Sequence, residues 1–519
     1  MDRRTFMLGT TSSGAALLGF GSMGFTQPAR RPLPIFPMTN LLNGFDERVP
    51  LRLLESTHDF GTGAASKTFG INNSYLGPVL RVKQGQTLPF DVNNQTSEMT
   101  TLHWHGLHIP GDVDGGPHQQ IQPGETWSPD VPINQNASMN WFHSHAHGTT
   151  AKQVYKGLAG IMLIEDDASL SADLPNTYGV DDFTLVLQDK TFDDAGLLNY
   201  NLTEAAIDDG FIGETLVING AIAPVAQTVP KGLVRLRILN GSNANFLTLS
   251  MANGPINVIA SDGGFLSSTV QTEDLIIAPG ERYEILVDMK QVDVNHLLVA
   301  QEVPGINGVN RLVHEFNRLS ERKKQLGGLN KLIRELWMTE GEIKFAALTL
   351  NRESMNGFDG SIPKNLANYS VPDRTAAVTT RSFELQQYTG ADLAALAAAG
   401  DNYCGDGTAM AINGKSMDMD RIDENVTKGE KEIWRISVDD WRHPFHIHGC
   451  SFRILSQESA PPPAYAQGWK DMVHVDKNGG WSEVLVQFDY EASKESPYMY
   501  HCHTLEHEDC GMMGQFTVS

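Results

Sequence analysis

The sequence predicts an all-β protein built from three similar β-sandwich domains, with a short helical insertion in the second. The chain has 519 residues, which is too many for one hydrophobic core, so several domains are expected. Its 49 glycines and 25 prolines, with only 19% charged residues, favour short strands joined by tight turns over long helices. An internal repeat then sets the number of domains.

The repeat is a glycine-containing turn that leads into a strand of alternating apolar residues. The turn at Gly85 recurs at Gly232 and Gly429, each time with a valine three positions earlier. A second repeated motif, Pro-Gly-Glu, follows the first two copies of this turn, at 123–125 and 279–281. Short alternating runs bounded by Gly, Pro and Asn are typical of β-sandwiches. We therefore expect domains at about 40–168, 169–347 and 348–519.

The N-terminus indicates export. Arg3 and Arg4 precede a weakly apolar run of Gly, Ala, Leu and Ser that reaches Phe25. Paired arginines before such a run are typical of a twin-arginine signal, here residues 1–27, and the expected location is the periplasm. The alternative is a disordered basic N-terminus. The run holds too many Gly, Ser and Thr residues for a membrane span. A proline-rich tether is expected at 28–40.

Residues 311–337 do not fit the β pattern around them. They form two apolar stripes of helical period, separated by Gly327 and Gly328, and carry seven Lys or Arg against three Glu. We expect a solvated helical insertion that packs on the second sandwich. The alternative is a lid or a surface for a partner.

The charge and the cysteines exclude several classes of protein. The net charge of −23 argues against nucleic acid or an anionic membrane surface as the partner. Four cysteines are too few for a disulfide framework, although a pair among Cys404, Cys450 and Cys510 stays open. We expect a monomer whose partners are small molecules.

Four short motifs of the form His-x-His indicate a metal site. In a strand, residues i and i+2 share a face, so each motif can offer two imidazoles. Two motifs fall in the first domain and two in the third, whereas the second domain has Asn245-Phe-Leu-Thr-Leu in the corresponding place. We expect one multinuclear site between the first and third domains, with the second as a spacer. The eight histidines are His103, His105, His143, His145, His446, His448, His501 and His503.

A separate mononuclear site is predicted around Cys502. With His443 and His507 it forms a two-His, one-Cys set, and Met512 supplies a weak axial thioether, which together are the ligands of a blue electron-transfer copper. Zinc would not need the flanking histidines, and an iron oxygenase would use a carboxylate. Because strand neighbours point to opposite faces, the residues on either side of Cys502 can face the multinuclear site.

The motifs in this order give a resemblance to a known family. They are His103-Trp-His-Gly-Leu, Asp112-Val-Asp114-Gly-Gly-Pro, Trp141-Phe-His-Ser-His-Ala-His-Gly, Gly157-Leu-Ala-Gly, Ile164-Glu-Asp-Asp, Gly468-Trp-Lys-Asp471 and Glu506-His-Glu-Asp-Cys-Gly-Met-Met. From about residue 40 to its end the chain resembles the multicopper oxidases, most of all the laccase-like bacterial copper-efflux type. The resemblance implies three cupredoxin-like Greek-key domains.

The resemblance also implies four copper ions, one of type 1, one of type 2 and two of type 3. His103 and His446 would hold the type 2 copper. The type 3 ligands would be His105, His143 and His503 for one copper, and His145, His448 and His501 for the other. Asp114 and Glu508 match the carboxylates that deliver protons in this family.

The expected reaction is an oxidation coupled to the reduction of oxygen. A reductant would give single electrons at the Cys502 copper, and four of them would reduce O2 to two waters. The resemblance suggests Cu(I), phenols or aromatic amines as reductants and a role in copper tolerance. Candidates for a Cu(I) site are Met355, Asp359 and Asp439, and Trp441 stands where the family has a second Met. Residues 349–380 hold one methionine, so the methionine-rich segment of the efflux type is missing.

The same motifs leave four alternative functions to compare. A laccase-type phenol oxidase without a role in copper detoxification differs only in its substrate. A non-enzymatic copper-binding protein, or a copper-free relative used in cell-envelope assembly, would be expected to lack ligands, and all are present. A copper nitrite reductase is disfavoured by the third domain and the paired histidines.

Overall fold

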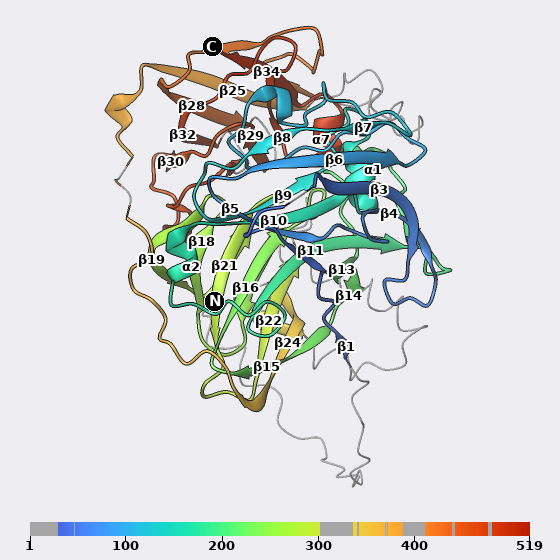
Figure 1. Cartoon of the computed structure of the whole chain (residues 1–519), viewed down its shortest axis with the longest axis vertical. Coiled ribbons are helices and arrows are strands. Elements are labelled where there is room, and N and C mark those ends of the chain that lie inside the picture. The colour runs from blue at the N-terminus through green and yellow to red at the C-terminus, as the bar shows by residue number, and fades with distance from the viewer. Residues whose placement is uncertain are drawn as a thin grey trace, which may run out of the picture.

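The structure is a computed structural model, and it describes residues 30–45, 47–301, 336–339, 342–368, 370, 372–387, 410–438, 442–475 and 480–519. These residues form six β-sheets and few helices, so the predicted all-β class is confirmed. The sheets pair into three sandwiches (Figure 1), coloured blue to cyan, green to yellow, and orange to red in chain order.

The first sandwich combines a four-stranded and a five-stranded sheet around a core that includes Leu88, Phe90 and Trp104. The four-stranded sheet has the order β2 (Met38–Asn40), β5 (Val79–Lys83), β10 (Ala159–Glu165) and β9 (Ser138–His143). The other sheet has the order β4 (Ser66–Ile71), β3 (Val49–His58), β6 (Thr87–Gln95) and β7 (Thr126–Trp127), and β8 (Asp130–Pro132) pairs with β6.

The second sandwich has the two largest sheets. One has the order β1 (Arg31–Pro32), β15 (Val225–Lys231), β24 (Glu342–Asn356), β22 (Val294–Gln301), β17 (Leu247–Met251) and β20 (Leu275–Ile277), with β23 (Leu336–Thr339) on β24. The other has the order β14 (Ala221–Ile222), β13 (Thr215–Ile218), β11 (Asp182–Phe192), β16 (Leu233–Asn240), β21 (Arg282–Asp288), β18 (Ile256–Ser261) and β19 (Gly264–Thr272), with β12 (Leu198–Asn199) on β11.

The third sandwich has two five-stranded sheets. One has the order β26 (Met410–Ile412), β25 (Thr379–Gln387), β28 (Lys431–Val438), β32 (Trp481–Gln487) and β30 (Arg453–Gln457). The other has the order β27 (Glu424–Val426), β34 (Met513–Val518), β33 (Tyr498–Cys502), β29 (His443–Ile447) and β31 (Met472–Val475). Within the described residues, four short α-helices lie between strands: α1 (Thr150–Lys156), α2 (Asp167–Ser171), α3 (Glu204–Asp208) and α7 (Leu505–Asp509).

The internal repeat has a clear structural meaning. Its three copies lead into β6, β16 and β28, and each of these strands pairs in parallel with an earlier strand of its own sandwich. The turns at Gly85 and Gly429 have φ of 88° and 82°, a left-handed conformation that glycine adopts without steric cost. In β6 the alternating burial of Leu88, Phe90 and Val92 is what the strand pattern predicts.

Two predictions about the connecting segments need correction. β24 runs through the predicted boundary between 347 and 348, so the second sandwich extends to Asn356. Leu336 and Trp337, the last residues of the predicted helical insertion, belong to β23, because they pair with β24. The rest of that insertion and the predicted export signal lie outside the described residues. The described residues of the predicted proline-rich tether are part of the sheets, since β1 pairs with β15 and β2 pairs with β5.

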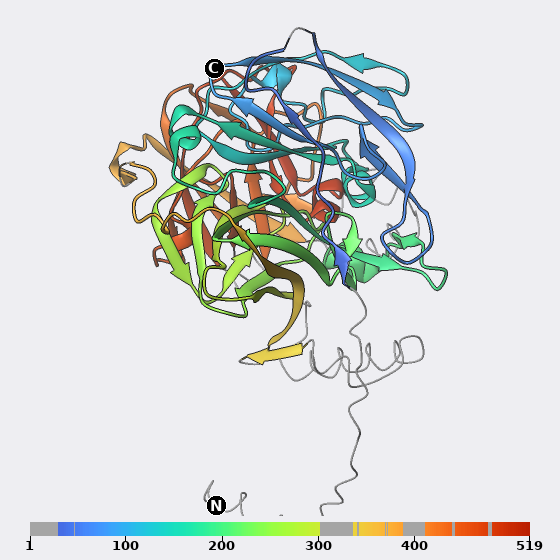
Figure 2. The same cartoon turned by 60° about the horizontal axis from the view of Figure 1, so that its bottom comes forward.

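The three sandwiches meet around a common centre (Figure 2), where residues of all three come into contact. Cys510 is in a disulfide, whereas Cys450 and Cys502 are free and buried. Within the described residues, no helix has both the length and the apolar character that a membrane span requires.

Candidate metal centres

The residues of the predicted mononuclear site converge in the third sandwich. The Sγ atom of Cys502 lies 3.4 Å from Nδ1 of His443 and 3.7 Å from Nδ1 of His507, and the two nitrogens are 3.2 Å apart. His443 begins β29, Cys502 ends β33, and His507 lies on α7. Met512 is fully buried, and its backbone bonds to both Cys502 and His507. One cation could therefore contact a thiol and two imidazoles here.

Burial controls the protonation of this group. It raises the pKa of the Cys502 thiol to about 12, although the backbone N–H of Thr504 donates to the sulfur. Burial also lowers the pKa of His507 to about 4. The thiol is thus protonated and the imidazole neutral near pH 7, and a bound cation would expel the thiol proton. The outer nitrogen of His507 donates to the carbonyl of Asp208 at the end of α3.

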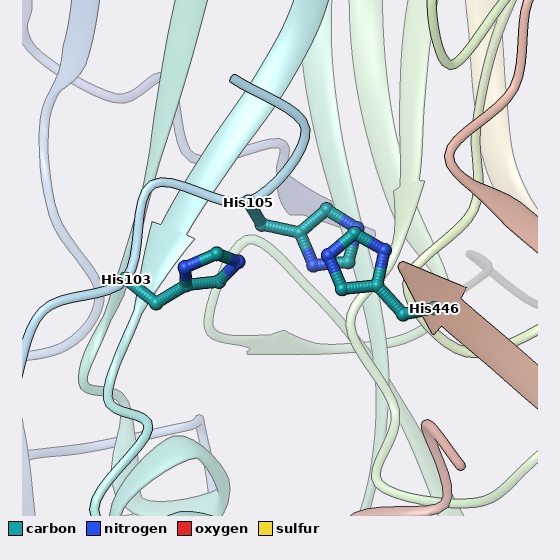
Figure 3. A group of neighbouring side chains, drawn as sticks. All are labelled: His103, His105 and His446. Atoms are coloured by element: carbon teal, nitrogen blue, oxygen red, sulfur yellow. The ribbon is translucent and has the colours of Figure 1, made fainter. Parts of the chain in front are cut away.

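The eight paired histidines converge at the contact between the first and third sandwiches. All are at most 1% exposed, and three groups of three place their nitrogens within 4.8 Å of one another. In Figure 3, His446 reaches from β29 to His105, and their rings stack at 3.7 Å. His103 stacks on His448 at 3.8 Å. The three groups are His103, His105 and His446; His105, His143 and His503; and His145, His448 and His501.

Hydrogen bonds fix the orientation of many of these rings. Nδ1 of His103 donates to the carbonyl of Asp114, and Nδ1 of His446 donates to the carbonyl of Asp471. A carbonyl can only accept, so these nitrogens carry the hydrogen and Nε2 keeps its lone pair in the neutral ring. His143 and His501 are held in the same way by the carbonyls of the residues that follow them.

The ring nitrogens that face the centre of the cluster either face one another or have no hydrogen-bond partner. This feature fits a metal site. Nε2 of His501 faces Nε2 of His145 at 3.2 Å and Nε2 of His448 at 3.3 Å. Nε2 of His103 and of His446 are buried without a hydrogen bond. Burial, followed by the neighbouring imidazoles, lowers the pKa of most of these rings, so neutral imidazole is their stable form. Buried neutral imidazoles that converge suit copper.

Strand register brings the motifs together. His446 on β29 lies opposite His501 on β33, and His103 forms an antiparallel bridge with His143 at the end of β9. The second histidine of each motif lies outside the strands. As a result, in three of the four His-x-His motifs the two histidines belong to different groups of nitrogens and do not bind the same metal.

Two buried carboxylates lie beside this cluster. Oδ2 of Asp114 is 2.8 Å from Nδ1 of His448 and 3.3 Å from Nδ1 of His103, and its other oxygen has no hydrogen bond. Glu508 is 3.1 Å from Nδ1 of His501 and 3.3 Å from Nδ1 of His145, without a hydrogen bond to either oxygen. Both residues were predicted from the sequence to lie near the multinuclear site.

The predicted substrate residues are not brought together. Met355 and Asp359 lie at the end of β24 and just beyond it, and Asp359 pairs with Lys290 of the second sandwich. Phe358 bridges to Leu233 at the start of β16, whereas the Cys502 site adjoins the loop after the other end of that strand. Eight residues of strand span about 24 Å, so this pair is wrong as a site beside Cys502. Asp439 and Trp441 lie outside the described residues.

Sequence reasoning gave no role to two residues that contact the site or to a third, Glu506, which precedes His507 in the chain. Asp471 bonds to His105, the carbonyl of Asp208 accepts from His507, and the fully buried Glu506 accepts hydrogen bonds from Tyr200 and Asn243 of the second sandwich. Asp471 and Glu506 belong to motifs of the resemblance, which was the available signal. Asp208 acts through its backbone, so its side chain gave none.

Comparisons with known proteins agree with this geometry. Three domain families, each described as multicopper oxidase, match residues 54–169, 181–318 and 382–519. The chain belongs to the multicopper oxidase family. Membership of this family implies copper binding and supports the general class of oxidoreductase.

The similar proteins are of two kinds, cell division proteins and multicopper oxidases. The cell division protein FtsP of Edwardsiella tarda (strain FL6-60) is 35% identical over 100% of this chain and 99% of its own length. The structure of the laccase-like multi-copper oxidase CueO from the lignin-degrading bacterium Ochrobactrum sp. is 39% identical, with a TM-score of 0.81 over 94% of this chain and all of that one. A multicopper oxidase of Campylobacter jejuni, described as a metallo-oxidase, is 25% identical, with a TM-score of 0.74 over 95% of this chain and 96% of that one.

Proposed function

We propose that this chain is an oxidase that takes single electrons from a reductant at the Cys502 site and reduces O2 to water at the eight-histidine cluster. The observation that carries the proposal is the convergence of all eight imidazoles beside a thiol with its own two imidazoles. Copper, when bound, would supply one-electron transfer at the first site and oxygen reduction at the second. Four ions are proposed, one of type 1, one of type 2 and two of type 3.

The chain connects the two sites by covalent bonds. Cys502 belongs to the mononuclear group, while its neighbours His501 and His503 belong to two different groups of the cluster. The backbone N–H of Cys502 bonds to the carbonyl of Met512, and that of His503 bonds to the carbonyl of Pro444. Both bonds hold the end of β33 against the elements that carry the other ligands.

Asp114 and Glu508 are proposed to deliver the protons that water formation needs. Each is fully buried, lies within 3.3 Å of two histidines of the cluster, and keeps at least one oxygen without a hydrogen bond. A carboxylate in that position can pass a proton to a nearby acceptor and take another from water.

The proposed reductants are Cu(I) and phenols or aromatic amines. The Ochrobactrum relative is described as oxidising lignin model compounds and lignosulfonate, which supports the phenolic class. The single methionine in 349–380 weakens the case for Cu(I), while the net charge of −23 favours a cation. The N-terminal sequence supports export to the periplasm by the twin-arginine route.

The test combines composition with activity. The purified protein is expected to hold about four coppers per chain and to show an intense thiolate-to-copper absorption band. A lower content or no band would refute the proposal. Oxygen uptake with Cu(I) and with a phenol, in the native chain and in Asp439→Ala, then assigns the substrate. An Asp439→Ala variant that oxidises Cu(I) at the native rate would remove that residue from the site.

The similarity to FtsP over the whole chain favours a second candidate, a role in cell division. The two functions separate in a strain that lacks this chain. If Cys502→Ser restores normal division but not copper tolerance, division does not need the oxidase. If it restores neither, a division role of the chain depends on the copper site.

A further inference from the structure

A buried group of charges joins all three sandwiches next to the histidine cluster. Arg282, the first residue of β21, donates through Nη1 and Nη2 to the two carboxylate oxygens of Asp471, both at 2.6 Å. Asp471 lies immediately before β31 and is 3.1 Å from Nε2 of His105. All three residues are completely buried. The described part of the second sandwich supplies no histidine to the cluster, and it reaches the cluster through an arginine.

Arg282 is held in place from several sides. Its Nε donates to the carbonyl of Met139 on β9, its Nη1 also donates to the carbonyl of Gly280, and its backbone N–H donates to Asp262. The strand that it contacts in the first sandwich is the one that ends at His143. One side chain therefore bonds to all three sandwiches.

The surrounding charges explain why the arginine is needed. Among the described residues, Asp262, Glu281 and Asp471 are buried together with two cations, Arg282 and Lys470. Lys470 is 2.6 Å from Glu281 and 2.9 Å from Asp262, so Asp471 depends on Arg282 for its compensating charge. A buried carboxylate that loses its partner cation is strongly disfavoured in the charged form.

The carboxylate in turn sets the orientation of His105. Nε2 of this ring bonds to Asp471, so in the neutral ring Nε2 carries the hydrogen and Nδ1 keeps its lone pair. Nδ1 then faces Nε2 of His143 at 3.4 Å, inside the cluster. His105 therefore turns the opposite nitrogen inward from His103, whose Nδ1 is held by a carbonyl.

We propose that Arg282 and Asp471 are positioning residues for the copper cluster, through which docking of the second sandwich sets the ring orientation of His105. This inference rests on the copper assignment of the proposed function. Without the arginine, Asp471 would lose the two hydrogen bonds that fix its carboxylate, and Nδ1 of His105 would no longer be held toward His143. Residues that orient a metal ligand in this way commonly contribute 10–100-fold to metal affinity.

The test compares two buried arginines of the same sandwich. Arg282→Met removes the positioning pair. Arg237→Met removes a similar buried pair, Arg237 with Asp182 at 2.7 and 2.8 Å, which shows no hydrogen bond or ion pair to a histidine among the described residues. Both variants lose stability. Only Arg282→Met is expected to release copper from the cluster to a chelator at about 10–100-fold lower chelator concentration. Its thiolate-to-copper band should persist, because the Cys502 site does not contact Arg282.

Electron paramagnetic resonance supplies the second readout. Two adjacent Cu(II) ions that couple magnetically give no signal, whereas isolated ions do. Arg282→Met should therefore show a larger detected fraction of its Cu(II) than Arg237→Met. Equal copper retention and equal detected fractions in the two variants would overturn the inference.

Two milder variants cover the case in which Arg282→Met does not fold. Asp471→Asn keeps the shape but lets the side chain donate to Nε2, and Arg282→Lys keeps the charge without the bidentate geometry. Both are expected to lose cluster copper ahead of the Cys502 copper, and native retention in both would equally overturn the inference. A native protein without cluster copper would instead refute the proposed function.

Discussion

The conformation of Gly106 allows a sharp test of the crowding beside His105. Gly106 has φ of 83°, and a Cβ atom there would lie 2.5 Å from Oδ2 of Asp471, 2.7 Å from Oδ1 of Asn140 and 2.8 Å from Nη2 of Arg282. Gly124, in the same sandwich, has φ of 85° and nothing within 4 Å of the same position. The two glycines therefore share a backbone conformation and differ in their surroundings.

Alanine at either position is expected to destabilise the protein, by different amounts. The left-handed conformation costs about 1–2 kcal/mol for a residue with a Cβ, and this is the whole effect expected at Gly124. At Gly106 the displaced buried groups add about 1–3 kcal/mol of overpacking, which gives about 2–5 kcal/mol in total. The displaced groups include the carboxylate that holds His105, so Gly106→Ala should also weaken copper binding at the cluster.

The assay is urea unfolding of both variants, together with copper content after purification. Gly124→Ala is expected to keep the native copper content and Gly106→Ala to lose copper from the cluster. If both variants show the same loss of unfolding free energy and the same copper content, the reasoning about Asp471 and His105 is refuted.

Three further predictions follow from the site and its surroundings. Cys502→Ser should abolish the thiolate-to-copper band and oxygen uptake with every reductant, and residual uptake at the native rate would contradict the proposed electron entry. Glu508→Gln should slow oxygen reduction by about 10²–10⁴-fold at unchanged copper content, measured as turnover with excess reductant, and a native rate would remove its proton role. Burial lowers the pKa of His108 to about 4, against 6.5 ordinarily. Between pH 7 and 5 this imidazole therefore becomes protonated in the unfolded chain but stays neutral in the folded chain. Stability should therefore fall as the pH falls through this range. Between pH 7 and 5, the free energy of unfolding from urea titrations should fall by about 1–2 kcal/mol less in His108→Gln than in the native chain. Equal losses would contradict the assigned cause.

Much of the fold could be predicted because its signals are local. The turn at Gly429 and the alternation of Leu88, Phe90 and Val92 reflect backbone conformation and strand period, which a short window of sequence reveals. The end of the second sandwich could not be placed, because β24 is held by pairing with β15, more than 100 residues earlier. Such long-range pairing leaves no local signal.

The metal ligands were predictable for a different reason. Histidine and cysteine are rare in this chain, with 17 and 4 copies, so their spacing is informative even without a structure. The groups that orient the ligands are mostly backbone carbonyls, such as that of Asp208, and sequence does not reveal these. Arg282 could not be distinguished from other strand arginines, because its partner Asp471 is 189 residues away.

The energetics of the cluster bear on whether the chain could serve a purely structural role. Nε2 of His103, Nε2 of His446 and both ring nitrogens of His503 are buried without hydrogen bonds. Each buried polar atom without a partner costs about 1–3 kcal/mol. A structural protein could remove these costs by replacing the rings with apolar residues of similar size. A bound cation can accept one lone pair from each of these rings and so removes most of the costs. The arrangement is therefore more stable with metal than without it. Any role of this chain in cell division is therefore expected to involve a metal-loaded protein.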